Sequence, residues 1–176
     1  NTTTMTKQLD RTLLALDPGL RELGWAILRG RRLIASGVVG LRQLPKEQRL
    51  PEARRHIRQW LKAHHPKAIL LEKTYRHPVP WLDDLHRLTL YVRRVARKNR
   101  LGFAAYAPQQ VRKTILGNGK GTKREVAAVV VARYGSLRVY LTQDRKWKER
   151  FWQNMFDAVA LALHHQFLTN PPSRSR

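Results

Sequence analysis

The chain has 176 residues, of which 42% are apolar, so it is long enough for one domain with an ordinary packed core. Its 35 Lys and Arg residues against 12 Asp and Glu residues give a net charge of +23, which favours a polyanionic partner such as DNA or RNA. No apolar run is long enough to span a membrane, no signal peptide is visible, and zero cysteines exclude disulfides and zinc–thiolate sites. We expect an intracellular protein of the cytoplasm or nucleoid, with no membrane partner.

Three strands are predicted at the start of the chain. Residues 13–16 form a continuous apolar run that stops at Asp-Pro-Gly, as a buried strand does at a turn. Residues 24–28 and 32–39 are further strand candidates, and Arg29-Gly30-Arg31 between them suits a tight hairpin. These three strands are expected to be consecutive and antiparallel.

After residue 50, helices and two more strands are predicted. In chain order these are a helix at 51–64, a strand at 68–71, a helix at 82–95, a strand at 103–106, and helices at 109–116, 122–134 and 149–167. Pro51 fits the first turn of its helix, where a missing N–H costs little. Thr122 and Glu125 have capping-box spacing, which predicts that a helix starts there.

This order of elements predicts an α/β fold with a mixed five-stranded sheet, three antiparallel strands followed by two parallel ones, flanked by helices. No repeat or internal linker is visible, so a single domain is expected over residues 10–168. Residues 1–9 and 169–176 are expected to be flexible tails.

The scarce acidic residues stand at particular places in this predicted fold. Asp17 and Glu72 each follow an apolar strand, at the carboxyl edge where ligands bind in open α/β sheets. Asn154 and Asp157 are three residues apart on one helix and therefore share a face. A helix packed across the sheet edge would bring that face to the two strand ends.

Converging carboxylates repel one another unless cations compensate them, and oxygen ligands select Mg²⁺ or Mn²⁺. Two such ions about 3.5–4 Å apart clamp the attacking water and the leaving oxygen of a phosphodiester. Each residue also has a simpler interpretation. Asp17 can belong to an ordinary turn, Glu72 to a solvated strand end, and Asp157 to a paired core charge. The three together favour the metal site.

Four segments resemble the RuvC-type Holliday junction resolvases, a branch of the RNase H-like nuclease superfamily. Residues 17–27 (DPGLRELGWAI) resemble the first strand and turn of that family, and Glu72 with Tyr75 resembles its acidic residue and nearby aromatic residue. Residues 117–123 (GNGKGTK) resemble its glycine-rich basic loop, and residues 157–165 resemble its closing helix.

The resemblance spans about residues 13–165 and implies an RNase H-like fold and a homodimer that nicks opposing strands of four-way DNA junctions symmetrically. It implies catalytic and metal-binding roles for Asp17, Glu72 and Asp157, with Mg²⁺ or Mn²⁺, two per active site. The family commonly has an acidic ligand where Asn154 stands. A neutral carbonyl oxygen there would hold the second metal more weakly, and Asn154 is either natural or an inactivating substitution. A helicase or branch-migration partner is compatible with this role, but the sequence does not specify one.

Basic residues around the glycine-rich loop are candidates for phosphate contacts, because glycine permits close approach and a helix amino end follows. A flexible solvated loop is the alternative. The expected DNA-binding residues are Tyr75, Arg76, Arg112, Lys113, Asn118, Lys120, Lys123 and Arg124. Tyr75 is expected either to stack on an unpaired base or to lie in the core.

Three other functions are left open by the residues. An RNase H-like nuclease that processes structured RNA shares the Asp-x-Gly start, although the basic glycine loop favours the resolvase. A non-catalytic junction-binding protein would explain Asn154. A basic ribosomal-type protein would explain the charge but not the placement of the carboxylates.

Overall fold

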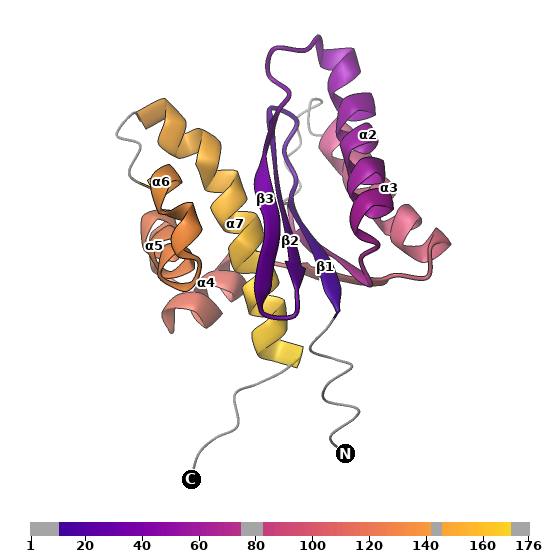
Figure 1. Ribbon diagram of the computed structural model, residues 1–176. Coiled ribbons are helices and arrows are strands. Elements are labelled where there is room, and N and C mark those ends of the chain that lie inside the picture. The colour runs from indigo at the N-terminus through magenta and orange to yellow at the C-terminus, as the bar shows by residue number, and fades with distance from the viewer. Residues whose placement is uncertain (1–10, 75–82, 142–145, 170–176) are drawn as a thin grey trace, which may run out of the picture.

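A mixed five-stranded sheet lies at the centre of the computed structural model, which describes residues 11–74, 83–141 and 146–169 (Figure 1). The strands are β1 (Thr12–Asp17), β2 (Glu22–Arg29), β3 (Arg32–Gly40), β4 (Ala68–Glu72) and β5 (Gly102–Tyr106), in the order β3-β2-β1-β4-β5. β1, β2 and β3 pair antiparallel, whereas β4 runs parallel to both β1 and β5. The predicted mixed sheet is confirmed.

Helices cover both faces of this sheet. They are α2 (Lys46–His64), α3 (Asp83–Lys98), α4 (Pro108–Leu116), α5 (Lys123–Arg133), α6 (Arg138–Leu141) and α7 (Lys146–Thr169), with a 3₁₀ turn at Gly135–Leu137 before α6. Figure 1 shows α2 and α3 on one face and α4 to α7 on the other. No helix in the described part of the chain is both long enough and apolar enough to cross a membrane.

The start of α2 differs from its prediction. The helix begins at Lys46, so Pro51 lies inside it as the sixth residue and not in the first turn. Pro45 caps the helix with an extended backbone, and its carbonyl accepts a hydrogen bond from the Gln48 amide at 3.0 Å. The earlier start places Leu50 in the core, where it is 7% exposed. That burial offsets the single helical hydrogen bond that Pro51 cannot donate.

Side chains alternate between the two faces of the sheet along each strand, and this alternation determines the face on which Asp17 and Glu72 lie. Leu13 and Ala15 of β1, and Leu70 of β4, belong to the core cluster that contains the apolar residues of α7. Their neighbours Leu14 and Leu16 belong to the opposite cluster, under α2 and α3. Because side chains alternate along a strand, Asp17 and Glu72 face the α4–α5–α7 layer.

Candidate active site

Two neighbouring parallel strands bring Asp17 and Glu72 together. Leu16 of β1 is in register with Leu71 of β4, so the next residue on each strand is a carboxylate at the carboxyl edge. Adjacent strands lie about 4.8 Å apart, which places the two acidic residues side by side. The predicted convergence of these strand ends is confirmed.

Asp157 reaches the same edge from α7. It is 8% exposed, in the middle of a run of buried residues that packs on β1 and β2. Gly24 of β2 allows this approach, because a Cβ at that position would collide with the backbone carbonyl of Asn154. The contact between the backbones of β2 and α7 therefore sets how closely Asp157 approaches the sheet.

Both carboxylate oxygens of Asp157 already have hydrogen-bond donors. Lys123 Nζ donates to Oδ2 at 2.7 Å, and Gln153 Nε2 donates to Oδ1 at 2.9 Å. Lys123 is the first residue of α5, which starts with a capping box. The Glu125 amide donates to Thr122 Oγ1 at 3.2 Å, and the Thr122 amide donates to Glu125 Oε2 at 2.6 Å. The predicted capping box is confirmed, and it fixes where Lys123 stands.

The carboxylates carry more negative charge than the surrounding cations neutralise. Burial, with repulsion from Glu72 and Asp157, raises the pKa of Asp17 well above its ordinary value, against the opposing effect of Lys123. Burial and the charge of Asp157 raise the pKa of Glu72 to about 7, although Lys123 and Arg112 lower it. Burial lowers the pKa of Lys123, but Asp157, Asp17 and Glu72 outweigh burial and raise it.

This donor set fits a divalent cation. All three acidic side chains offer oxygen ligands, which suit Mg²⁺ or Mn²⁺. The raised pKa values of Asp17 and Glu72 show that these two carboxylates lack compensating positive charge. Within the described residues, no three His, Cys, Asp or Glu side chains are grouped closely enough to hold a metal ion as they stand. Asp157 is turned to Lys123 instead. To hold a metal ion together with Asp17 and Glu72, Asp157 would have to give up its hydrogen bond from Lys123.

Comparison with known proteins assigns this chain to a family. The family model for crossover junction endodeoxyribonuclease RuvC matches residues 13–165. The chain belongs to the RuvC family. A relative of that name from Methylorubrum populi is 33% identical over 165 residues, which cover 89% of this chain and 80% of the relative. A second, from Renibacterium salmoninarum, is 29% identical and covers 92% of this chain and 82% of the relative.

Solved structures agree with the family assignment. The structure of Thermus thermophilus RuvC superposes with a TM-score of 0.67 at 25% identity, covering 90% of this chain and 95% of that one. T. thermophilus RuvC in complex with a Holliday junction substrate gives a TM-score of 0.70 at 22% identity, covering 93% and 97%. The predicted RNase H-like fold of the RuvC type is therefore confirmed.

Asn154 of the RuvC-family chain lies one turn before Asp157 on α7. Its Nδ2 donates to the backbone carbonyl of Glu22 at 3.1 Å, and the residue lines a pocket with Gly19 and Arg21. An aspartate in this conformation would place a carboxylate against that carbonyl, two acceptors facing each other. The amide thus ties α7 to the start of β2. A role for Asn154 as a metal ligand stays a prediction.

The predicted DNA-binding residues lie in different settings. Lys113, Asn118, Lys120 and Arg124 are exposed on α4, the loop and α5. Asn118 Oδ1 accepts a hydrogen bond from the Lys120 amide at 3.1 Å, which gives the loop a local turn. Tyr75 and Arg76 lie outside the described residues.

Two basic residues predicted to contact DNA interact with the acidic residues of the site in this structure. Lys123 pairs with Asp157, and the partly buried Arg112 acts electrostatically on Glu72. Gln153 was not among the predicted site residues. Its position four residues before Asp157 is the signal that identifies it, because residues at i and i+4 are neighbours on a helix.

Proposed function

We propose that Asp17, Glu72 and Asp157 form the metal-dependent cleavage site with which this RuvC-family endodeoxyribonuclease resolves four-way DNA junctions. The observation that carries the proposal is the convergence of three carboxylates, two of them with raised pKa values, at the carboxyl edge of β1 and β4. Uncompensated carboxylates in a protein of net charge +23 are expected where a divalent cation and a polyanion meet.

The proposed roles of the site residues follow from the elements that carry them. Asp17 and Glu72 hold the metal site from the sheet, and Asp157 holds it from α7, with Gln153 orienting one of its oxygens at 2.9 Å. When bound, two Mg²⁺ or Mn²⁺ ions supply the positive charge that activates water and stabilises the leaving oxygen of the phosphodiester. With Asp157 engaged by a metal ion, Lys123 would lose its partner, and its ammonium group would be free to contact the DNA backbone near the cleaved bond.

The DNA is held next to this edge by the loop at 117–121 and the first turn of α5. Gly117 ends α4 with φ of 76°, a left-handed conformation that glycine adopts without strain. The exposed Lys113, Lys120 and Arg124 supply phosphate contacts, each adding about 0.9 to the salt slope of duplex binding. Tyr75 and Arg76 are proposed as contacts to the junction itself.

A homodimer is part of the proposal. A four-way junction has two-fold symmetry, and a two-fold dimer presents one metal site to each of two opposing strands. Light scattering after gel filtration tests this assembly. A dimer mass is expected, whereas a monomer that nevertheless makes paired nicks would contradict the dimeric mechanism.

Cleavage of a labelled four-way junction tests the function. The wild type, Glu72→Gln and Asn154→Asp are incubated with Mg²⁺ or Mn²⁺ beside a linear duplex and an RNA hairpin. Paired symmetric nicks in the junction alone, lost in Glu72→Gln, are expected.

Three other outcomes would change the assignment. Cutting only by Asn154→Asp would mean that the chain carries a disabled site. Tight junction binding without cutting by any variant would favour a binding protein. Cleavage restricted to RNA would favour the processing nuclease.

A further inference from the structure

A pocket of about 640 Å³ opens beside the carboxylates. It is lined by Gly19, Leu20, Arg21, Glu22, Lys46, Arg49, Asp84, Leu85 and Asn154. Gly19 comes two residues after Asp17, and Asn154 precedes Asp157 by one helical turn, so the pocket lies next to the proposed cleavage site. Its other walls come from the first turns of α2 and α3, which lie across the sheet from α4 and α5 (Figure 1). The volume falls in the range of ligand sites, roughly 300–1,000 Å³.

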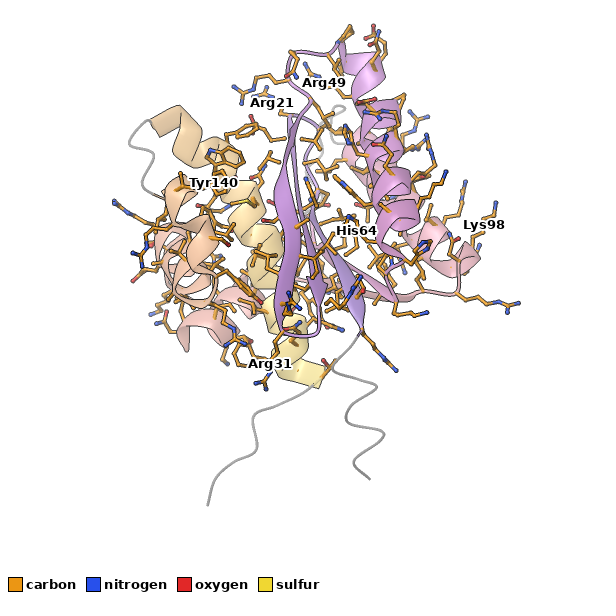
Figure 2. The ribbon with its side chains drawn as sticks, in the orientation of Figure 1. Arg21, Arg31, Arg49, His64, Lys98 and Tyr140 are labelled. Atoms are coloured by element: carbon orange, nitrogen blue, oxygen red, sulfur yellow. The ribbon has the colours of Figure 1, made fainter. Side chains whose placement is uncertain are left out.

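Three cations line this pocket. Arg21 and Lys46 are exposed, whereas Arg49 is held in place by two backbone carbonyls. Arg49 Nε donates to the carbonyl of Leu44 at 3.0 Å, and its Nη2 donates to the carbonyl of Arg42 at 3.0 Å. Figure 2 shows Arg21 and Arg49 at the same end of the molecule. A guanidinium fixed in this way is a preorganised planar cation, which suits stacking on a base.

The two acidic residues of the lining already have partners. Glu22 pairs with Arg42 at 3.1 Å, and Asp84 pairs with Arg87 at 3.3 Å, so their charges are partly offset. Leu20 and Leu85 supply apolar surface. The pocket thus combines exposed cations, a fixed planar cation and apolar walls, which match the phosphates and the base of a nucleotide.

We propose that this pocket binds one unstacked nucleotide of the DNA strand that crosses the carboxylates. Arg21 and Lys46 contact its phosphates, and Arg49 with Leu85 contacts its base. A four-way junction supplies such a nucleotide, because its strands change partners at the crossover and base stacking is interrupted there. The proposal rests on the proposed function, and it assigns to the edge of the sheet a second DNA contact, on the side opposite the loop at 117–121.

Fluorescence of 2-aminopurine tests the pocket without metal or cleavage. The probe replaces each base in turn at the crossover of a four-way junction, and emission is measured in EDTA with the wild type, Arg21→Gln, Leu85→Trp and Arg31→Gln. Arg31 is the matched control, since it is an exposed arginine at the opposite end of the molecule (Figure 2). Melting temperatures equal to that of the wild type establish that each variant is folded.

Emission is expected to rise severalfold at one position, because an unstacked base is no longer quenched by its neighbours. Arg21→Gln and Leu85→Trp should abolish that rise, and Arg21→Gln should weaken junction binding about tenfold and lower the salt slope by about 0.7. Arg31→Gln should match the wild type. Two results would overturn the proposal that the pocket binds a nucleotide. One is emission that is unchanged at every position. The other is Arg21→Gln and Leu85→Trp variants that behave like Arg31→Gln.

Cleavage in Mg²⁺ is assayed separately on the same junctions. If the wild type cuts the junction but 2-aminopurine emission does not rise at any position, nucleotide binding in the pocket is refuted and the proposed function is unaffected. A wild type that never cuts the junction would refute the function, while the emission data still decide whether the pocket holds a nucleotide.

Discussion

Lys123 Nζ lies 2.7 Å from Asp157 Oδ2 and joins the start of α5 to the buried carboxylate of α7. The lysine side chain is 58% exposed, whereas that of Asp157 is 10% exposed. One end of this ion pair is therefore in solvent and the other in the protein interior. The pair neutralises one of three clustered carboxylates in the metal-free protein.

Replacing Lys123 by methionine is expected to destabilise the metal-free protein by about 1 kcal/mol at pH 8, a value reduced for the exposure of the lysine. Added Mg²⁺ should then stabilise the variant more than the wild type, because no ammonium group competes for Asp157. Urea unfolding with EDTA or Mg²⁺ measures both effects. Lys113→Met, a change of the same kind on exposed α4, is the control. Equal stabilisation of variant and wild type by Mg²⁺ would argue against competition.

The raised pKa of Glu72 predicts how stability depends on pH. The folded protein holds this proton up to a pKa of about 7, against 4.5 for an ordinary glutamate, so stability falls as pH rises from about 4.5 to 7. At about 1.4 kcal/mol per pKa unit, the loss from this group is on the order of 3 kcal/mol in the absence of metal.

Glu72→Gln removes that titration. The variant should be more stable than the wild type at pH 8 in EDTA, with a smaller difference at pH 4.5. Urea unfolding across this pH range gives the comparison. A wild type and variant with parallel pH profiles would refute the assignment of the titration to Glu72.

Asn154→Asp should cost about 1 kcal/mol of stability in EDTA, because the carbonyl of Glu22 loses its donor and faces a carboxylate. Asn154→Ala loses the same hydrogen bond without adding a charge, so it should be less destabilised. Thermal unfolding of the two variants separates these contributions. The reverse order of stability would mean that the amide does not tie α7 to β2.

Gly24→Ala should destabilise the protein by about 1–3 kcal/mol and reduce cleavage, because its Cβ would push the Asn154 backbone away from β2. Gly135→Ala is the matched control, since no heavy atom lies within 4 Å of a Cβ there. Thermal unfolding and junction cleavage measure both consequences. Full cleavage by a destabilised Gly24→Ala variant would show that Asp157 keeps its place despite the collision.

The sheet and the two strand-borne carboxylates follow from local patterns. Short apolar runs that end in Asp17 and Glu72 identify both the strands and the residues at their ends, and parallel pairing then brings the two side chains together. Thr122 and Glu125 likewise identify the start of α5 from their spacing alone.

Other parts of the site depend on contacts between distant segments. Lys123 and Asp157 are separated by 34 positions, and their contact requires α5 to pack against α7. The direction of the Asn154 amide depends on the backbone of Glu22, which is 132 residues away in the chain. Neither relationship has a periodic signature. From the sequence, the charge of Lys123 therefore predicts that it binds DNA, and the family resemblance predicts that Asn154 binds metal.

At Gly24 the main chain of β2 comes so close to the main chain of α7 that an added Cβ would collide with the Asn154 carbonyl oxygen. Main-chain atoms have no alternative rotamers, so a change of side-chain volume elsewhere in the core cannot easily be absorbed at this point. Apolar substitutions along α7 are therefore expected to lower the melting temperature before they change the distance between Asp157 and Asp17. Away from the Gly24 contact, stability would then change without catalytic geometry, and an engineer could alter the heat resistance of this nuclease there without redesigning its chemistry.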